Sequence, residues 1–154
     1  MFQTTDPESL ASALAHFTGT QSYINLRYPW LRMKFLLTEG AQYLAEKGQC
    51  YWLMDAIASH QINSKVSSEP FQAWTLKVGL ERRPTPAEKR RIEKGVPADL
   101  SRPNFAVLTC TDGNEKLLAR QEIPYTDFPL PSITLYAALD ESLGGLVVML
   151  PSEY

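Results

Sequence analysis

The chain has 154 residues, of which 44% are hydrophobic and 21% charged, and its formal net charge is −2. This composition is typical of a globular protein with enough residues for one core, so we expect a single domain over residues 1–154. A charge this small excludes a general attraction to nucleic acid or to membrane surfaces, and the apolar run Leu146–Leu150 is far too short to span a bilayer.

The first half of the chain predicts helices. Residues 6–19 begin with Asp6 as a cap and Pro7 at the first helical position, and Gly19 follows as a stop signal. Residues 21–40 are ambiguous, because the run 32–38 fits either a strand or a buried segment that leads into the next helix. A helix is expected from Thr38 to Gly48. Residues 50–61 then form another helix, or continue the same one past a kink.

Beyond Pro70 the hydrophobic period changes from that of a helix to that of a strand. Strands are predicted over 71–80, in a hairpin within 104–123 that turns at Asp112-Gly113-Asn114, and over 132–139 and 144–150. Since helices come first and strands second, the sequence predicts an α+β fold. We expect an antiparallel sheet of about four or five strands with two or three helices packed on one face.

A basic excursion interrupts the strands at residues 81–103, which is long for a connection within a compact domain. Thr85 and Glu88 match a capping box and predict a short surface helix that Gly95 closes. The excursion up to Lys94 has six basic and three acidic residues, a net +3, which leaves −5 for the rest of the chain. The candidate partner-binding residues are its six bases, Arg82, Arg83, Lys89, Arg90, Arg91 and Lys94.

The basic excursion is open to three interpretations. Its glutamates lie at helical spacing from its bases, which is typical of a self-paired, solvated face. An acidic protein partner or a second copy of the chain would also fit its charge. Nucleic acid is a weaker alternative, because no aromatic side chain lies among these bases to stack on a nucleobase.

The helix 50–61 is apolar almost all round and yet carries Asp55, Ser59 and His60. Asp55 and His60 lie about 140° apart around a helix, so they cannot pair on it. His60, near the helix end, has the plain role of satisfying the last carbonyl groups. Asp55 either anchors a loop or an arginine elsewhere, or lines a pocket.

The segment 122–131 is rigid because it contains three prolines. It is either a recognition loop that presents its polar residues or an aromatic corner that plugs the edge of the core. In the first case a pocket forms between this loop and the helix 50–61. The ligand-binding residues would then be Asp55, Tyr125, Thr126 and Asp127.

The sequence contains no recognisable catalytic, metal or cofactor motif. Its two histidines and two cysteines are isolated from one another, and no Walker, Rossmann or nucleophile-elbow pattern is present. We therefore predict no catalytic residue, no metal and no cofactor, and the balance lies against an enzyme. Cys50 and Cys110 are expected to be buried free thiols. Residues 1–10 lack the features of a secretory signal, so we expect a cytoplasmic protein.

Five segments, His16–Gln21, Leu36–Gly48, Cys50–Gln61, Phe71–Leu76 and Arg120–Leu130, together resemble one protein family. It is a bacterial, largely cyanobacterial, family of domains of unknown function. The resemblance implies that the helix 50–61 and the loop 122–131 belong to one unit, and it implies no activity.

The sequence thus predicts a small cytoplasmic, non-catalytic binding or interaction module that binds a protein partner or a second copy of itself. One alternative is a small-ligand-binding protein or enzyme with the pocket between 50–61 and 122–131. A second is a nucleic-acid accessory protein that uses the arm 82–94. No membrane partner is expected.

Overall fold

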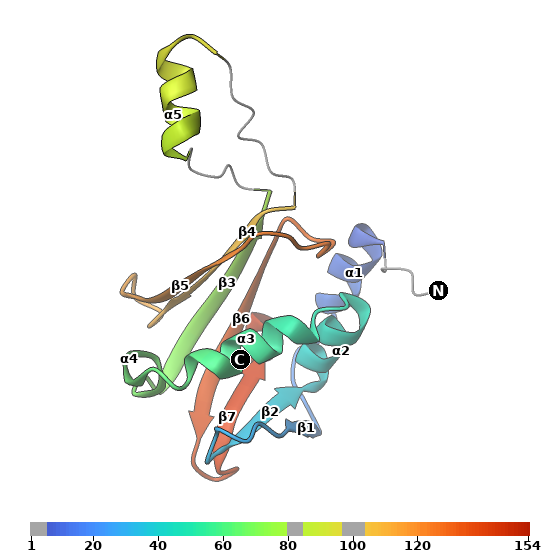
Figure 1. Ribbon diagram of the computed structural model, residues 1–154. Coiled ribbons are helices and arrows are strands. Elements are labelled where there is room, and N and C mark those ends of the chain that lie inside the picture. Colours follow the sequence, from blue (N-terminus) through green and yellow to red (C-terminus); the bar gives the residue numbers. More distant parts are fainter. Residues whose placement is uncertain (1–5, 80–84, 97–103) are drawn as a thin grey trace.

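A computed structural model describes residues 6–79, 85–96 and 104–154 (Figure 1). Within these ranges the chain forms one seven-stranded sheet, five α-helices and a final 3-10 turn. In chain order the elements are α1 (Pro7–Leu14), β1 (Tyr23–Leu26), β2 (Lys34–Thr38), α2 (Glu39–Lys47), α3 (Tyr51–His60), α4 (Ser64–Ser67), β3 (Phe71–Val78), α5 (Pro86–Glu93), β4 (Ala106–Thr111), β5 (Leu117–Ile123), β6 (Ser132–Asp140), β7 (Gly145–Met149) and η1 (Pro151–Glu153).

The strand order is β1-β2-β7-β6-β3-β4-β5, and every neighbouring pair is antiparallel except β2 and β7. The α+β class is confirmed. The predicted antiparallel sheet of four or five strands with two or three helices is wrong, because the sheet is mixed and both numbers are too low. The error has a physical reason: β1 and β2 lie in the helical half of the chain, and β2 pairs with a strand near the other end, which leaves no local pattern.

The local predictions agree better with the structure. Asp6 caps α1 by accepting a hydrogen bond from Ser9 N at 3.1 Å, and Thr38 caps α2 by accepting one from Ala41 N at 3.2 Å. The ambiguous residues 32–38 contain a strand, β2, and α3 is a helix separate from α2. At the predicted hairpin turn between β4 and β5, Asp112 Oδ1 accepts a hydrogen bond from Asn114 N at 2.8 Å.

The parallel pair β2–β7 depends on a glycine. A Cβ atom at Gly145 would overlap with the carbonyl oxygen and the Cβ atom of Lys34, which faces it in the neighbouring strand. Any larger residue would therefore push the two strands apart at the first residue of their ladder.

The core lies between the sheet and the helices α2 and α3, which cross one face of it (Figure 1). On β3, Trp74 and Leu76 point into this core and alternate with less buried residues. The opposite face carries Phe71 and Tyr136. The C-terminal turn folds back to them, since the Tyr154 ring lies 5.4 Å from that of Phe71 and 5.6 Å from that of Tyr136.

The carboxylate of Glu153 ties this C-terminal turn to the start of α2. Its Oε1 accepts hydrogen bonds from Thr38 Oγ1 at 2.7 Å and from Leu150 N at 3.0 Å, and its Oε2 accepts one from Gly40 N at 3.1 Å. A negative charge at a helix N-terminus is favourable, because it satisfies free N–H groups and opposes the helix dipole. The end of the chain therefore stabilises a helix from its first third.

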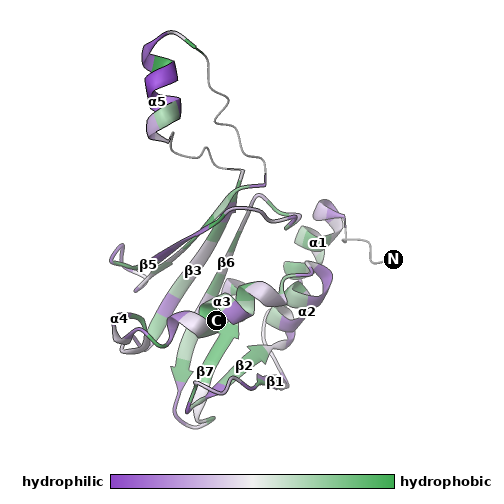
Figure 2. Cartoon of the chain, viewed as in Figure 1, coloured by the Kyte–Doolittle hydropathy of each residue, from purple (hydrophilic) through white to green (hydrophobic). Residues whose placement is uncertain are grey.

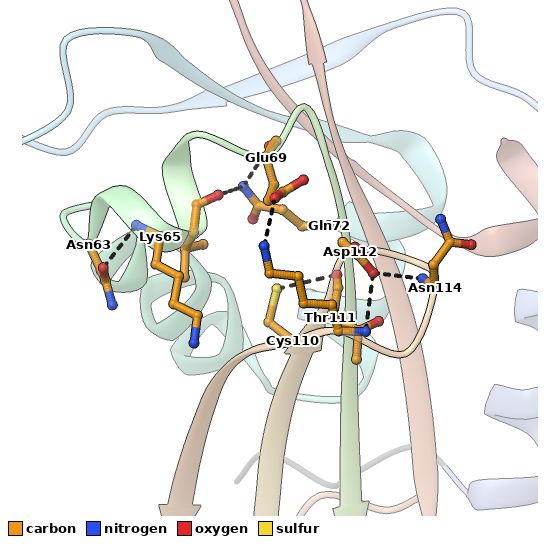
Figure 3. Close-up of polar contacts among 10 residues, drawn as sticks. Asn63, Lys65, Glu69, Gln72, Cys110, Thr111, Asp112 and Asn114 are labelled. Atoms are coloured by element: carbon orange, nitrogen blue, oxygen red, sulfur yellow. Dashed lines mark hydrogen bonds and ion pairs between the residues drawn. The ribbon is translucent and has the colours of Figure 1, made fainter.

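A buried amide pair joins the helix layer to the sheet. Gln61 Nε2 donates to Gln72 Oε1 at 2.8 Å, and Gln72 Nε2 donates back to Gln61 Oε1 at 3.0 Å. The same Gln72 oxygen accepts from Trp74 Nε1 at 3.0 Å, and the Gln72 nitrogen also donates to the carbonyl oxygens of Val66 and Glu69. Figure 3 shows Gln72 beside Glu69. Both amides are almost fully buried, so this network fixes the corner of α3 and α4 over β3.

The excursion is described only over residues 85–96. The predicted capping box of Thr85 and Glu88 is present, and Gly95 adopts a φ of 81° just after α5. No residue of α5 is buried, and Figure 2 shows the helix as mostly hydrophilic and standing apart from the sheet. Arg82 and Arg83 lie outside the described residues.

We predict that Gln72→Leu lowers the free energy of unfolding by about 2–4 kcal/mol, because it leaves the buried side-chain oxygen of Gln61 and the Trp74 indole N–H without hydrogen-bond partners. The measurement is urea unfolding followed by circular dichroism. Gln21→Leu, a change at an exposed glutamine, is the control and should alter stability by less than about 0.5 kcal/mol. If Gln72→Leu were as stable as the Gln21→Leu control, the proposed role of the amide pair would be contradicted.

Candidate functional site

Asp55 lies on the exposed side of α3 and holds the connection between β1 and β2. Its Oδ1 accepts a hydrogen bond from the Tyr28 hydroxyl at 2.6 Å. Three residues further along α3, the carbonyl oxygen of Ala58 accepts a hydrogen bond from Trp30 Nε1 at 3.3 Å. Asp55 in this position anchors a loop, which is one of the two roles considered from the sequence.

Burial and the neighbouring carboxylate change the chemistry of Tyr28. Its pKa is raised above the usual value of 10.0, first because the ring is partly buried and then because Asp55 accepts its proton in a hydrogen bond and repels the phenolate. The hydroxyl therefore remains a donor to Asp55 at any physiological pH.

The buried residue Thr126 holds the proline-rich loop in place through hydrogen bonds. Thr126 is buried; its N–H donates to the carbonyl oxygen of Asn104 at 2.8 Å, and its Oγ1 accepts from Phe128 N at 3.1 Å. Phe128 belongs to the core, whereas Tyr125 is 70% exposed and Asp127 is also exposed. Phe128 thus plugs the edge of the core, whereas Tyr125 and Asp127 lie in solvent, and a recognition role for these two residues stays a prediction.

The structure brings Tyr125, Thr126 and Asp127 together, but it does not bring Asp55 to them. Asp55 faces the β1–β2 connection, whereas the loop contacts Asn104 and, through Phe128, lies beside Gly48. Leu130 and Pro131 of the loop help to line an apolar pocket of about 480 Å³. Its other lining residues include residues of α1 and residues after β7. Sequence reasoning missed this pocket, because its walls come from three distant segments.

The surroundings of the histidines and cysteines do not match those that nucleophilic catalysis requires. His60 shares a hydrogen bond of 2.8 Å with the side-chain oxygen of Gln121 and packs on the ring of Trp74. His16 is exposed in the turn that follows α1. Burial raises the pKa of both thiols, of Cys50 and of Cys110, to about 12, so neither forms a thiolate near neutral pH.

The described part of the chain also contains no group of three or more His, Cys, Asp or Glu side chains that could hold a metal ion. Every helix in that part is too short or too polar to cross a membrane.

The described bases of the excursion lie together on α5. Lys89, Arg90, Arg91 and Lys94 are all exposed, and two apolar side chains lie among them, Ile92 at 43% and Val96 at 49% exposure. A helix with this surface has both charge and apolar area to offer a partner.

Comparison with known proteins gives a family but no activity. The model of DUF6876, a family of unknown function, matches residues 8–154. No curated protein and no solved structure matches the chain. The family agrees with the resemblance noted from the sequence, whose bacterial and cyanobacterial origin stays a prediction.

We predict that Tyr28→Phe flattens the loss of stability at alkaline pH. A tyrosine whose folded pKa is raised contributes stability below pH 10 that is lost as the pH rises above that value, because only the unfolded chain then releases the proton. The variant should be about 1 kcal/mol less stable at pH 7 and should lose less stability between pH 9 and 11. Urea unfolding across this range checks it. Tyr125→Phe, which changes an exposed ring, should keep the wild-type slope.

We also predict that a thiol reagent such as DTNB labels neither Cys50 nor Cys110 in the native protein at pH 8, because both thiols are buried and protonated. Both should react fully in guanidinium chloride. Labelling of either thiol in the native protein at the rate of the unfolded chain would contradict this environment.

Proposed function

The chain belongs to the family of unknown function DUF6876, and for this member we propose a cytoplasmic, non-catalytic interaction module that binds another protein. The observation that carries the proposal is the gathering of three binding features at one end of the sheet. They are the basic helix α5, the exposed Tyr125 of the proline-rich loop, and the apolar pocket beneath α1.

Backbone hydrogen bonds support this gathering. The N–H of Val78, at the end of β3, donates to the carbonyl oxygen of Pro131 at 2.9 Å, and the N–H of Thr126 donates to the carbonyl oxygen of Asn104 at 2.8 Å. Asn104 follows the excursion and Val78 shortly precedes it, so the loop 124–131 is bonded on both sides of the point where the excursion leaves the sheet. Because Pro131 also lines the apolar pocket, one partner could contact all three features.

The charge distribution favours an acidic protein partner, and a second copy of the chain offers one. Residues 85–96 carry four basic and two acidic side chains, a net +2, so the remainder of the chain carries −4. Opposite charges on two surfaces accelerate and orient their association. Ile92 and Val96 would add the apolar contact area that charge alone does not supply.

Other observations support the remaining parts of the proposal. Two buried, unpaired cysteines fit a reducing compartment such as the cytoplasm. The family match spans residues 8–154, a range that includes the excursion, which supports a single domain.

The main competing function is small-ligand binding. The apolar pocket beneath α1 supports it better than the predicted pocket that Asp55 would line. A pocket of about 480 Å³ has the size of a small-molecule site, and its walls include Leu14, Leu130 and Ile133. A nucleic-acid role for the arm would rest on Arg82 and Arg83 as well as on the α5 bases. Salt-dependent binding of labelled DNA or RNA to the protein would support this nucleic-acid role.

Light scattering over a concentration series tests the proposal. We expect the wild-type mass to rise towards that of a dimer at low ionic strength, and both Arg90→Glu/Arg91→Glu and high salt to keep the chain monomeric. Lys47→Glu/Lys65→Glu, which reverses two exposed charges elsewhere, is the matched control and should associate like the wild type.

A wild-type chain that stays monomeric at about 1 mM, which is the weak end of specific association, would exclude a second copy as the partner. A photo-crosslinking residue at position 92, compared with one at Ile62, which is still more exposed, then tests for a foreign partner in cells. Equal crosslinking from both positions would contradict the interaction module itself.

A further inference from the structure

The connection between β1 and β2 forms a second concave surface, far in sequence from the excursion. A pocket of about 250 Å³, which we call the hairpin pocket, is lined by residues 25–28 and 31–34. Its wall includes three cationic side chains, those of Arg27, Arg32 and Lys34, and no carboxylate. Tyr28 and Leu31 give it an apolar side.

The three cations lack an anionic partner. None of them forms an ion pair or a side-chain hydrogen bond with another residue in the described part of the chain, and all three are exposed. The carboxylate of Asp55 accepts a hydrogen bond from the Tyr28 hydroxyl and does not line the pocket. Asp140, across β7 from Lys34, is occupied by Ser142 Oγ at 2.6 Å and Leu143 N at 3.2 Å. Three like charges around one opening repel one another unless an anion enters.

The pocket is also held in shape before any ligand arrives. The Tyr28 hydroxyl and the Trp30 indole N–H both bond to α3, Leu31 N donates to the carbonyl oxygen of Tyr28 at 3.0 Å, and Lys34 N donates to that of Gly144 at 3.2 Å. A wall fixed at four points loses little conformational freedom on binding, so a ligand gains most of the interaction energy.

We propose that the hairpin pocket binds the phosphate group of a nucleotide, either free or within a single strand. Two guanidinium groups match the geometry of phosphate oxygens, and Lys34 adds a third charge. Trp30 does not line the pocket, but its ring packs 5.0 Å from that of Tyr28, which does, and it is 46% exposed. The proposal therefore assigns to this indole the stacking contact with the base. This inference does not depend on the proposed interaction module, which uses other residues.

Calorimetric titration at low salt tests the inference with AMP, inorganic pyrophosphate and a short oligothymidylate. We expect the wild type to bind AMP and pyrophosphate, and Arg27→Gln/Arg32→Gln to weaken both at least tenfold, since each change removes a charge-assisted contact. Lys47→Gln/Lys65→Gln removes the same charge elsewhere and should change affinity less than about twofold. Trp30→Leu should weaken AMP more than pyrophosphate. Melting temperatures show that each variant is folded.

The oligothymidylate separates the two sources of phosphate. Binding tighter than that of AMP, with a steep salt dependence, identifies a single strand as the ligand, and equal or weaker binding identifies the free nucleotide. Three results would overturn the proposal: no binding of any probe by the wild type, equal loss in the Lys47→Gln/Lys65→Gln control, or oligothymidylate binding that survives Arg27→Gln/Arg32→Gln and is lost in Arg90→Glu/Arg91→Glu.

Discussion

The reciprocal hydrogen bonds between the Gln61 and Gln72 side chains set the position of the helix layer on the sheet. Both amides are shielded from water, so each bond must be made for the fold to be stable. With the end of α3 fixed over β3, the middle of the helix comes beside the β1–β2 connection, where Asp55 and Ala58 receive the side chains of Tyr28 and Trp30. The shape of the hairpin pocket therefore follows from an interaction at the C-terminal end of α3.

This arrangement assigns different chemistry to different parts of the molecule. The excursion and the proline-rich loop share one end of the sheet, where α5 offers positive charge with apolar side chains and Tyr125 is anchored through Thr126. The β1–β2 connection offers positive charge beside aromatic rings and little flexibility. An exposed cationic helix suits a broad protein surface, whereas a fixed cationic pocket suits a compact anion.

Features encoded by neighbouring residues could be predicted from the sequence, and features that join distant residues could not. The caps at Asp6, Thr38 and Thr85 each need only a polar side chain near free N–H groups, and all three are present. The β2–β7 pair and the bond between Tyr28 and Asp55 left no such trace. Tyr28 and Trp30 do lie between the bases Arg27 and Arg32 in the sequence, and Lys34 follows two residues later. Their order in the chain does not show that the three bases surround one opening, because only the turn between β1 and β2 brings them together.

The bonds from Glu153 to Thr38 and Gly40 have a consequence for biosynthesis. While a ribosome is still translating the second half of the chain, β2 has β1 on one side and unpaired backbone groups on the other, and α2 lacks its outer cap. Both defects disappear together only after residues 145–153 emerge from the exit tunnel. The segment from β1 to α2 therefore reaches its final structure only after residues 145–153 have been translated, and until then its exposed strand edge is a natural target for chaperones.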